Sequence, residues 1–120
     1  MCMSQSLEPL YEKLYQNISQ EIPVLDPDIA IRVMQITRSL EKISPTRSKP
    51  HVHLDVKYKD GVDLHQKVDE IRDKYPIQAA VNKWGDGVII SGLMSIKNVQ
   101  VVCSDPDMVE VTGLANARHN

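Results

Sequence analysis

Three side chains on one predicted strand are of the types that metal sites and general-base sites use. His51, His53 and Asp55 stand in the segment HVHLDVKYKDG at a spacing of two residues. On a β-strand, that spacing sends all three side chains to the same side. Imidazole nitrogen and carboxylate oxygen are ligands that zinc favours, and a catalytic zinc site needs three protein ligands with one open position. The row is therefore a candidate zinc or acid–base site.

The same row also fits the solvated face of an ordinary sheet, and we favour this simpler interpretation. Neighbouring same-side residues on a strand stand about 6–7 Å apart, which limits chelation by all three side chains. The next histidine, His65, falls in the first turn of the predicted helix that follows. We expect this helix to bury its apolar face on the other side of the sheet. A third ligand would have to come from a neighbouring strand, from the N-terminal helices or from another chain.

The N-terminal region reads as two helices. Between Leu7 and Ile18 the apolar residues recur at steps of three and four, which is the helical interval. Asp26 is the predicted N-cap of a second helix, and Pro27 after it suits the first helical position. Residues 1–43 are therefore predicted to form a helical hairpin, and residues 44–50 a polar linker.

Beyond the linker the apolar period changes from helical to alternating, as expected for strands. Residues 51–58 alternate, residues 64–75 return to a helical period, and IQAAVNKW forms a second predicted strand. A strand, a helix and a strand joined so tightly predict a βαβ unit with parallel strands. The turn WGDG then leads to a third strand at VIISG. NVQVVCS predicts a fourth strand and MVEVT a short fifth, which gives a sheet region of 51–114 and a loose tail of 115–120.

The order strand, helix, strand, strand resembles the first part of a ferredoxin-like fold. That fold would next require a second crossover helix, and the segment LMSIK is too short to hold one. We therefore expect a partial likeness only. The prediction is a single α+β domain over residues 1–120, with a helical hairpin and a four- or five-stranded mixed sheet.

Composition narrows the classes of function. The 120 residues are 42% hydrophobic and 25% charged, which is typical of a globular domain. A net charge of −2 argues against a protein that coats nucleic acid or anionic lipid by charge alone. The two cysteines, Cys2 and Cys103, lie far apart and predict no disulfide scaffold. Without a secretory signal or an apolar run of membrane-spanning length, we expect a cytoplasmic protein.

Charge is unevenly distributed along the N-terminal half. Residues 1–31 carry five acidic residues and one basic residue, whereas residues 32–50 carry five basic residues and one acidic residue. The basic set, which is a candidate contact for nucleic-acid phosphates, comprises Arg32, Arg38, Lys42, Arg47 and Lys49. Pairing with the acidic first helix, within one chain or between two, explains the same pattern and is the interpretation that we favour.

The second helix carries a narrow apolar stripe of the kind that packs helix on helix. Its residues are Ile29, Val33, Ile36, Leu40 and Ile43. We predict that this stripe is the interface of a homodimer, with packing on the chain's own sheet as the rival. Since no nucleophile–base pair or cofactor loop stands out, the function predicted is that of a small non-catalytic interaction or regulatory protein. The His/Asp site and weak nucleic-acid binding remain the alternatives.

Overall fold

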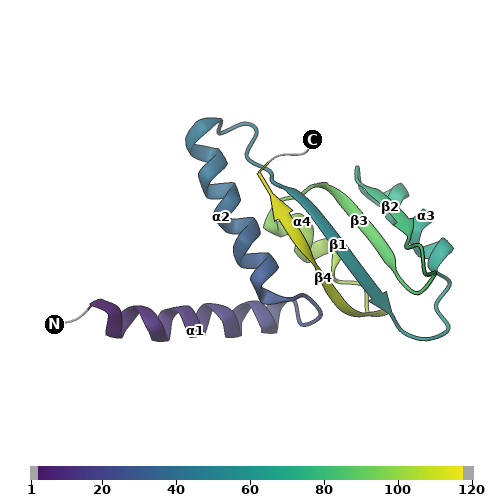
Figure 1. Cartoon of the computed structure of the whole chain (residues 1–120), viewed down its shortest axis with the longest axis horizontal. Coiled ribbons are helices and arrows are strands. Elements are labelled where there is room, and N and C mark those ends of the chain that lie inside the picture. Colours follow the sequence, from purple (N-terminus) through teal and green to yellow (C-terminus); the bar gives the residue numbers. More distant parts are fainter. Residues whose placement is uncertain (1–2, 118–120) are drawn as a thin grey trace.

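The computed structural model describes residues 3–117 and contains four helices and four strands (Figure 1). The helices are α1 (Met3–Glu21), α2 (Pro27–Ile43), α3 (Leu64–Lys74) and α4 (Ile96–Val102). The strands are β1 (His51–Tyr58), β2 (Gln78–Val81), β3 (Val88–Leu93) and β4 (Met108–Asn116). The α+β class and the helix pair ahead of the strands, both predicted from the sequence, are confirmed.

The four strands form one sheet in the order β2-β3-β1-β4, and every neighbouring pair is antiparallel. β1 and β2 run in the same direction, as the βαβ prediction requires, but β3 lies between them. The sheet is therefore antiparallel in its pairing and not mixed. The element order from β1 to β4 is βαββαβ, which is the complete ferredoxin-like arrangement and not only its first part.

The fourth predicted strand is wrong, because the segment from Ile96 to Val102 is the helix α4. Ser95 caps it: its side chain accepts a hydrogen bond from the backbone N–H of Asn98, and the Asn98 side chain accepts one from the backbone of Ser95. This capping box fixes the first turn, and the buried residues Val99 and Val102 follow at a helical spacing of three. Two turns suffice for the second crossover.

The last strand is longer than the sequence predicted. β4 extends to Asn116, so that Ala115, expected in a loose tail, is a buried residue of the sheet and pairs with Val52 of β1. Its long pairing with β1 includes a close approach at Gly113, where a Cβ atom would stand 1.9 Å from the His53 carbonyl oxygen. Residues 118–120 of the predicted tail lie outside the described residues.

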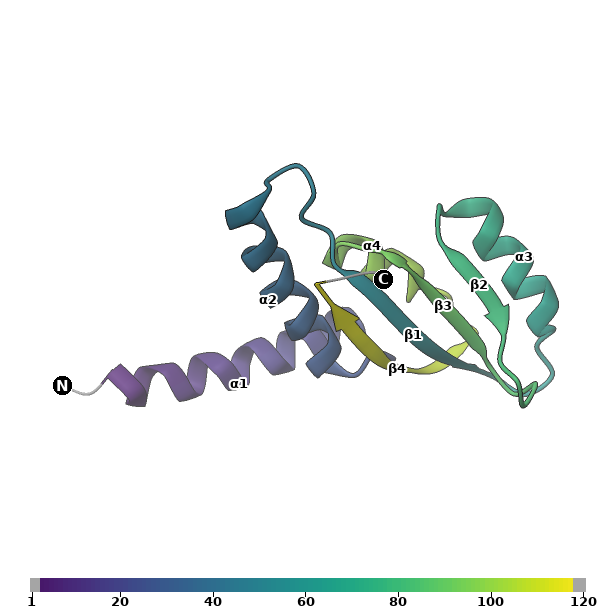
Figure 2. The same cartoon turned by 45° about the horizontal axis from the view of Figure 1, so that its top comes forward.

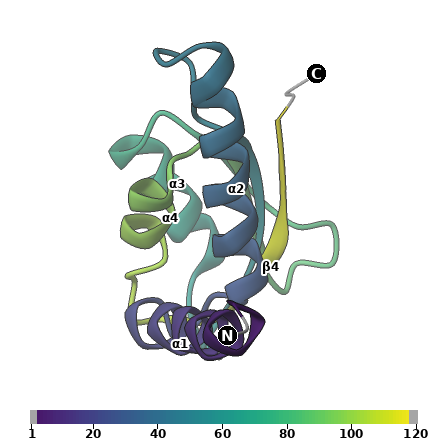
Figure 3. The ribbon, with the colours of Figure 1, turned by 90° about the vertical axis from the view of Figure 1, so that its left-hand side faces the viewer.

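The core lies between the sheet and three of the helices. Figure 3 shows α3 and α4 on one side of the sheet, with α2 beside β4. The alternating residues of β1 that face these helices are fully or almost fully buried, from Val52 at 0% exposure to Tyr58 at 9%. The α2 helix contributes Ile29, Ala30 and Val33 to the same core. It packs mainly on β4 and also contacts α4.

The α1 helix contacts the rest of the domain, formed by the sheet and the other three helices, only near the C-terminal end of α1 (Figure 2). Ile18 and Ile22 are buried, and the segment that follows α1 is hydrogen-bonded to β4 through Val111, which donates to Val24 at 2.7 Å and accepts from Asp26 at 3.0 Å. The rest of α1 projects away from the sheet, so that the molecule is 56 Å long but only 22 Å thick. The two N-terminal helices therefore form an open pair.

Candidate functional site

The His/Asp row lies on the sheet face opposite the helices, as the sequence predicted. The Nε2 atom of His53 stands 3.9 Å from Oδ1 of Asp55, which is a loose ion-pair distance when the imidazole is protonated. Across the sheet, His53 is flanked by Ser91 and Leu114. Within residues 3–117 no three His, Cys, Asp or Glu side chains are grouped so that they would hold a metal ion. A zinc or acid–base role for His51, His53 and Asp55 stays a prediction.

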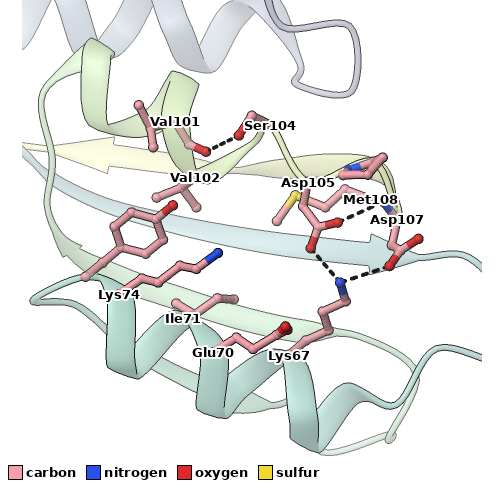
Figure 4. A pocket seen from close by; sticks show the side chains of 12 residues that line it. Lys67, Glu70, Ile71, Lys74, Val101, Val102, Ser104, Asp105, Asp107 and Met108 are labelled. Atoms are coloured by element: carbon pink, nitrogen blue, oxygen red, sulfur yellow. Dashed lines mark hydrogen bonds and ion pairs between the residues drawn. The ribbon is translucent and has the colours of Figure 1, made fainter.

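A second cluster, which the sequence did not point to, lines a cleft between α3 and the loop before β4 (Figure 4). Lys67 of α3 places its Nζ atom 2.9 Å from Oδ2 of Asp105 and 2.9 Å from Oδ2 of Asp107. The hydrogen bond to Asp105, followed in size of effect by the one to Asp107, raises the pKa of Lys67 above its ordinary value. Burial alone would raise the pKa of Asp105. Its pKa is lowered nevertheless, because the carboxylate accepts hydrogen bonds from Lys67 and from the backbone N–H of Asp107 and lies near lysine charges.

This arrangement favours a structural role for the cluster. A lysine that is held protonated by two carboxylates is neither a nucleophile nor a base, and its single positive charge offsets one of their two negative charges. Burial raises the pKa of the neighbouring Tyr58 to about 12, and its buried hydroxyl has no hydrogen-bond partner among the described residues. The cluster therefore ties α3 to the start of β4.

Cys103, at the C-terminal cap of α4, is also unsuited to chemistry. Its side chain is buried in the core, and burial raises the pKa of its thiol to about 12. The thiolate is the reactive form of cysteine, so that this thiol is inert near neutral pH. The sequence prediction of a buried structural thiol is confirmed, although the residue ends a helix and not a strand.

The five basic residues of the second charge segment are exposed and are distributed over α2 and the segment that follows it. Arg32, Arg38 and Lys42 lie on α2, whereas Arg47 and Lys49 line a shallow groove with Leu40 and Leu93. None of the five forms an ion pair within residues 3–117, so the predicted pairing with the acidic α1 does not occur inside one chain. The link between the two helices is instead a hydrogen bond from the Tyr15 hydroxyl to Asp28.

The predicted dimer stripe belongs largely to the chain's own core. Ile29, Val33 and Ile36 are at most 4% exposed, because α2 lays them against β4 and α4. Leu40 is half-buried, and Ile43 is exposed at the end of the helix. The rival arrangement, in which the stripe packs on its own domain, is the one that the structure adopts for these three residues. They are not accessible to a second chain.

An exposed apolar face lies instead on the projecting part of α1. It consists of Leu7, Leu10, Tyr11 and Leu14, which we call the α1 face, with exposures of 56%, 61%, 52% and 40%. The four residues follow one another at steps of three, one and three, so that they share one side of the helix. The same apolar series continues into the buried Ile18 and Ile22. The α1 face is therefore an extension of a core-packing surface beyond the core.

A groove adjoins the α1 face where the helix enters the body. It has a volume of about 190 Å³ and lies between α1, α2 and α4. Leu14 and Ile18 form its α1 wall, while Ala30 and Met34 of α2 and Ile96 of α4 form the other walls. We call it the α1–α2–α4 groove. Because Leu14 belongs both to this groove and to the α1 face, the two make one continuous apolar surface.

In comparisons with known proteins, no family model, no curated protein and no solved structure matches the chain. No helix among residues 3–117 is long and apolar enough to cross a membrane. The α1 face and the adjoining groove are thus the candidate functional site on structural grounds alone.

Proposed function

We propose that the protein is a small, non-catalytic interaction protein that self-associates through the α1 face. The observation that carries this proposal is the exposure of four large apolar side chains on a helix that projects from a well-packed domain. Monomeric proteins rarely expose contiguous apolar patches larger than a few hundred Å², and such large patches commonly mark interaction sites. The projecting helix gives the patch access to a partner without any change in the body.

The setting of this interaction is proposed to be intracellular. Cys103 is a free thiol in the core. Free thiols fit a reducing compartment, because disulfides are formed and kept in oxidising ones.

Sedimentation velocity of the parent protein and of two variants tests the proposal. The parent is expected to associate reversibly between micromolar and submillimolar concentration. Leu10→Glu places a charge in the centre of the α1 face, and we expect association at least about tenfold weaker, since tenfold corresponds to about 1.4 kcal/mol. Gln16→Glu adds the same charge on the far side of the exposed helix and serves as the matched control.

The control variant should associate like the parent. A parent that stays monomeric at every concentration would overturn the proposal, and equal weakening by Leu10→Glu and Gln16→Glu would show that net charge and not the α1 face is responsible. Circular dichroism of all three proteins should show the same helix content, because neither substitution touches the core.

A further inference from the structure

The shallow groove that contains Arg47 and Lys49 differs in chemistry from the apolar surface of α1. It lies at the loop that joins α2 to β1 (Figure 1), and we call it the loop groove. Its volume of about 450 Å³ falls in the usual range of small-molecule sites. The loop supplies two cationic and two hydroxyl side chains, namely Arg47, Lys49, Thr46 and Ser48. The other lining residues are apolar: Leu40 of α2, Leu93 of β3 and Ala117 after β4.

The loop is held at both ends, so that its side chains have a defined place. Pro45 stands at the second position of a turn, which the backbone N–H of Arg47 closes by donating to the Ser44 carbonyl at 3.1 Å. Pro50 is buried, and its carbonyl accepts a hydrogen bond from the backbone N–H of Met94 at 3.0 Å. Each proline also fixes one backbone dihedral angle. An anchored loop loses less conformational entropy when it binds a ligand.

The two cations of the loop groove have no counter-charge in the protein. Neither Arg47 nor Lys49 forms an ion pair within residues 3–117, and none of the lining residues is acidic. Glu41, the acidic residue nearest to Leu40, is exposed and lies about 100° around α2 from it. A chain whose net charge is −2 therefore keeps two positive charges at one groove without neutralising them.

We infer that the loop groove binds a small organic phosphate, namely a phosphate monoester whose organic part is apolar. Such a group carries a charge of about −1.5 to −2 at neutral pH, which two cations balance. The planar guanidinium of Arg47 suits bidentate contact with two phosphate oxygens, and the Lys49 ammonium adds a point charge. The hydroxyls of Thr46 and Ser48 are donors for the remaining oxygens. The apolar side of the groove takes the organic part of the ligand.

The basic residues of α2 favour a single phosphate group over a nucleic-acid strand. At about 100° per residue, Arg38 and Lys42 lie roughly 160° around the helix from Leu40, on the side away from the loop groove. Lys42 stands in the last turn, where a cation complements the negative end of the helix dipole. Arg32 is about two turns of helix from Leu40. A strand requires a track of cations along its backbone, whereas the groove offers two.

Titration of the ¹⁵N-labelled protein with phenyl phosphate, followed through the backbone amide signals by NMR, tests the site. We expect saturable shifts at residues 46–49 and at Leu93, with a dissociation constant at or below about 1 mM. Phenol lacks the phosphate and inorganic phosphate lacks the apolar part. Each should bind at least about tenfold more weakly than phenyl phosphate, because each makes only part of the contacts.

Two double variants locate the binding. Arg47→Gln with Lys49→Gln should weaken phenyl phosphate binding at least about tenfold, since both charged donors are lost. Arg38→Gln with Lys42→Gln removes the same charge from the other side of α2, and this matched control should bind like the parent. All four side chains are exposed, so that both variants should keep the fold of the parent.

The site would be overturned if phenyl phosphate gave no saturable shift, or if the two double variants weakened its binding equally. Equal affinity for inorganic phosphate would overturn the organic ligand. A short single-stranded oligonucleotide could also bind at least about tenfold more tightly than phenyl phosphate and be weakened by both double variants. That outcome would overturn the small ligand in favour of a nucleic acid. The loop groove is separate from the α1 face, so none of these results bears on self-association.

Discussion

The first two helices of this chain carry apolar residues at the same helical spacing, and yet they differ in what covers them. The stripe of α2 lies against β4 and α4, so that Val33 is fully buried. The series of α1 begins with Leu7, which is 56% exposed, and is buried only from Ile18 onward. The difference comes from the short segment between the helices, because its hydrogen bonds to Val111 hold the base of α1 at the edge of the sheet. An amphipathic pattern thus predicts a need for a partner surface, and the topology decides whether the chain supplies it.

The difference between the two helices is tested most strongly by introducing a glutamate into the apolar side of each. Val33→Glu buries an unpaired carboxylate and should lower the free energy of unfolding by about 4 kcal/mol or more. Leu10→Glu should change it by less than about 0.5 kcal/mol, as is usual for exposed positions. Urea unfolding followed by circular dichroism, at concentrations low enough for monomers, measures both. A strong loss of stability in Leu10→Glu would mean that the α1 face is part of the core.

The boundary between the two halves of α1 can be located with smaller changes. Ile18→Ala removes a side chain that is 8% exposed and should cost about 2–3 kcal/mol, because it leaves a cavity. Leu14→Ala, one turn earlier, should cost less than about 1 kcal/mol in the monomer, since its side chain is 40% exposed. The same urea titration compares them. Equal costs would place the boundary nearer the N-terminus than the structure has it.

Lys67→Met tests the body at a place where charge, and not apolar packing, makes the contact. It leaves Asp105 and Asp107 without their common partner, and we expect a loss of about 1–2 kcal/mol at neutral pH. The pKa of Asp105 is lowered in the folded protein, so that its contribution is present at neutral pH and is lost as the pH falls through the folded-state pKa. The difference between parent and Lys67→Met should therefore shrink below about pH 4.

Urea unfolding at a series of pH values from neutral to acidic measures this difference. A gap between the two proteins that does not change with pH would contradict the assignment of the stabilisation to the Lys67 ion pairs. Loss of the aliphatic stem of lysine is largely controlled, because methionine fills similar space.

The sequence predicted the parts of this fold that rest on local patterns. Asp26 caps α2 as its type suggests, and the alternation from Val52 to Tyr58 gives the buried face of β1. It failed at α4, where NVQVVCS contains enough valine to look like a strand. The capping pair Ser95 and Asn98 was the signal that indicated a helix there. Recognition of that helix would have completed the ferredoxin-like order of elements.

The candidate site was predictable only in part. The apolar series of α1 is visible in the sequence, but its exposure depends on where the segment after Ile22 attaches to β4, which is a contact between distant residues. For the same reason the stripe of α2 looked like a dimer interface, although Val33 is part of the core. Lys67 is separated from Asp105 and Asp107 by 38 or more residues along the sequence, so no local sequence pattern predicts this cluster.

Hydrogen–deuterium exchange of α1 as a function of protein concentration tests the central claim most directly, because it reports on the α1 face itself. A helix end without packing opens readily, so its amides exchange fast in the monomer. We predict that the amides of residues 7–14 become markedly more protected as the concentration rises, while those of β1 stay constant. Exchange of residues 7–14 that is fast and unchanged from the lowest to the highest concentration would contradict the account.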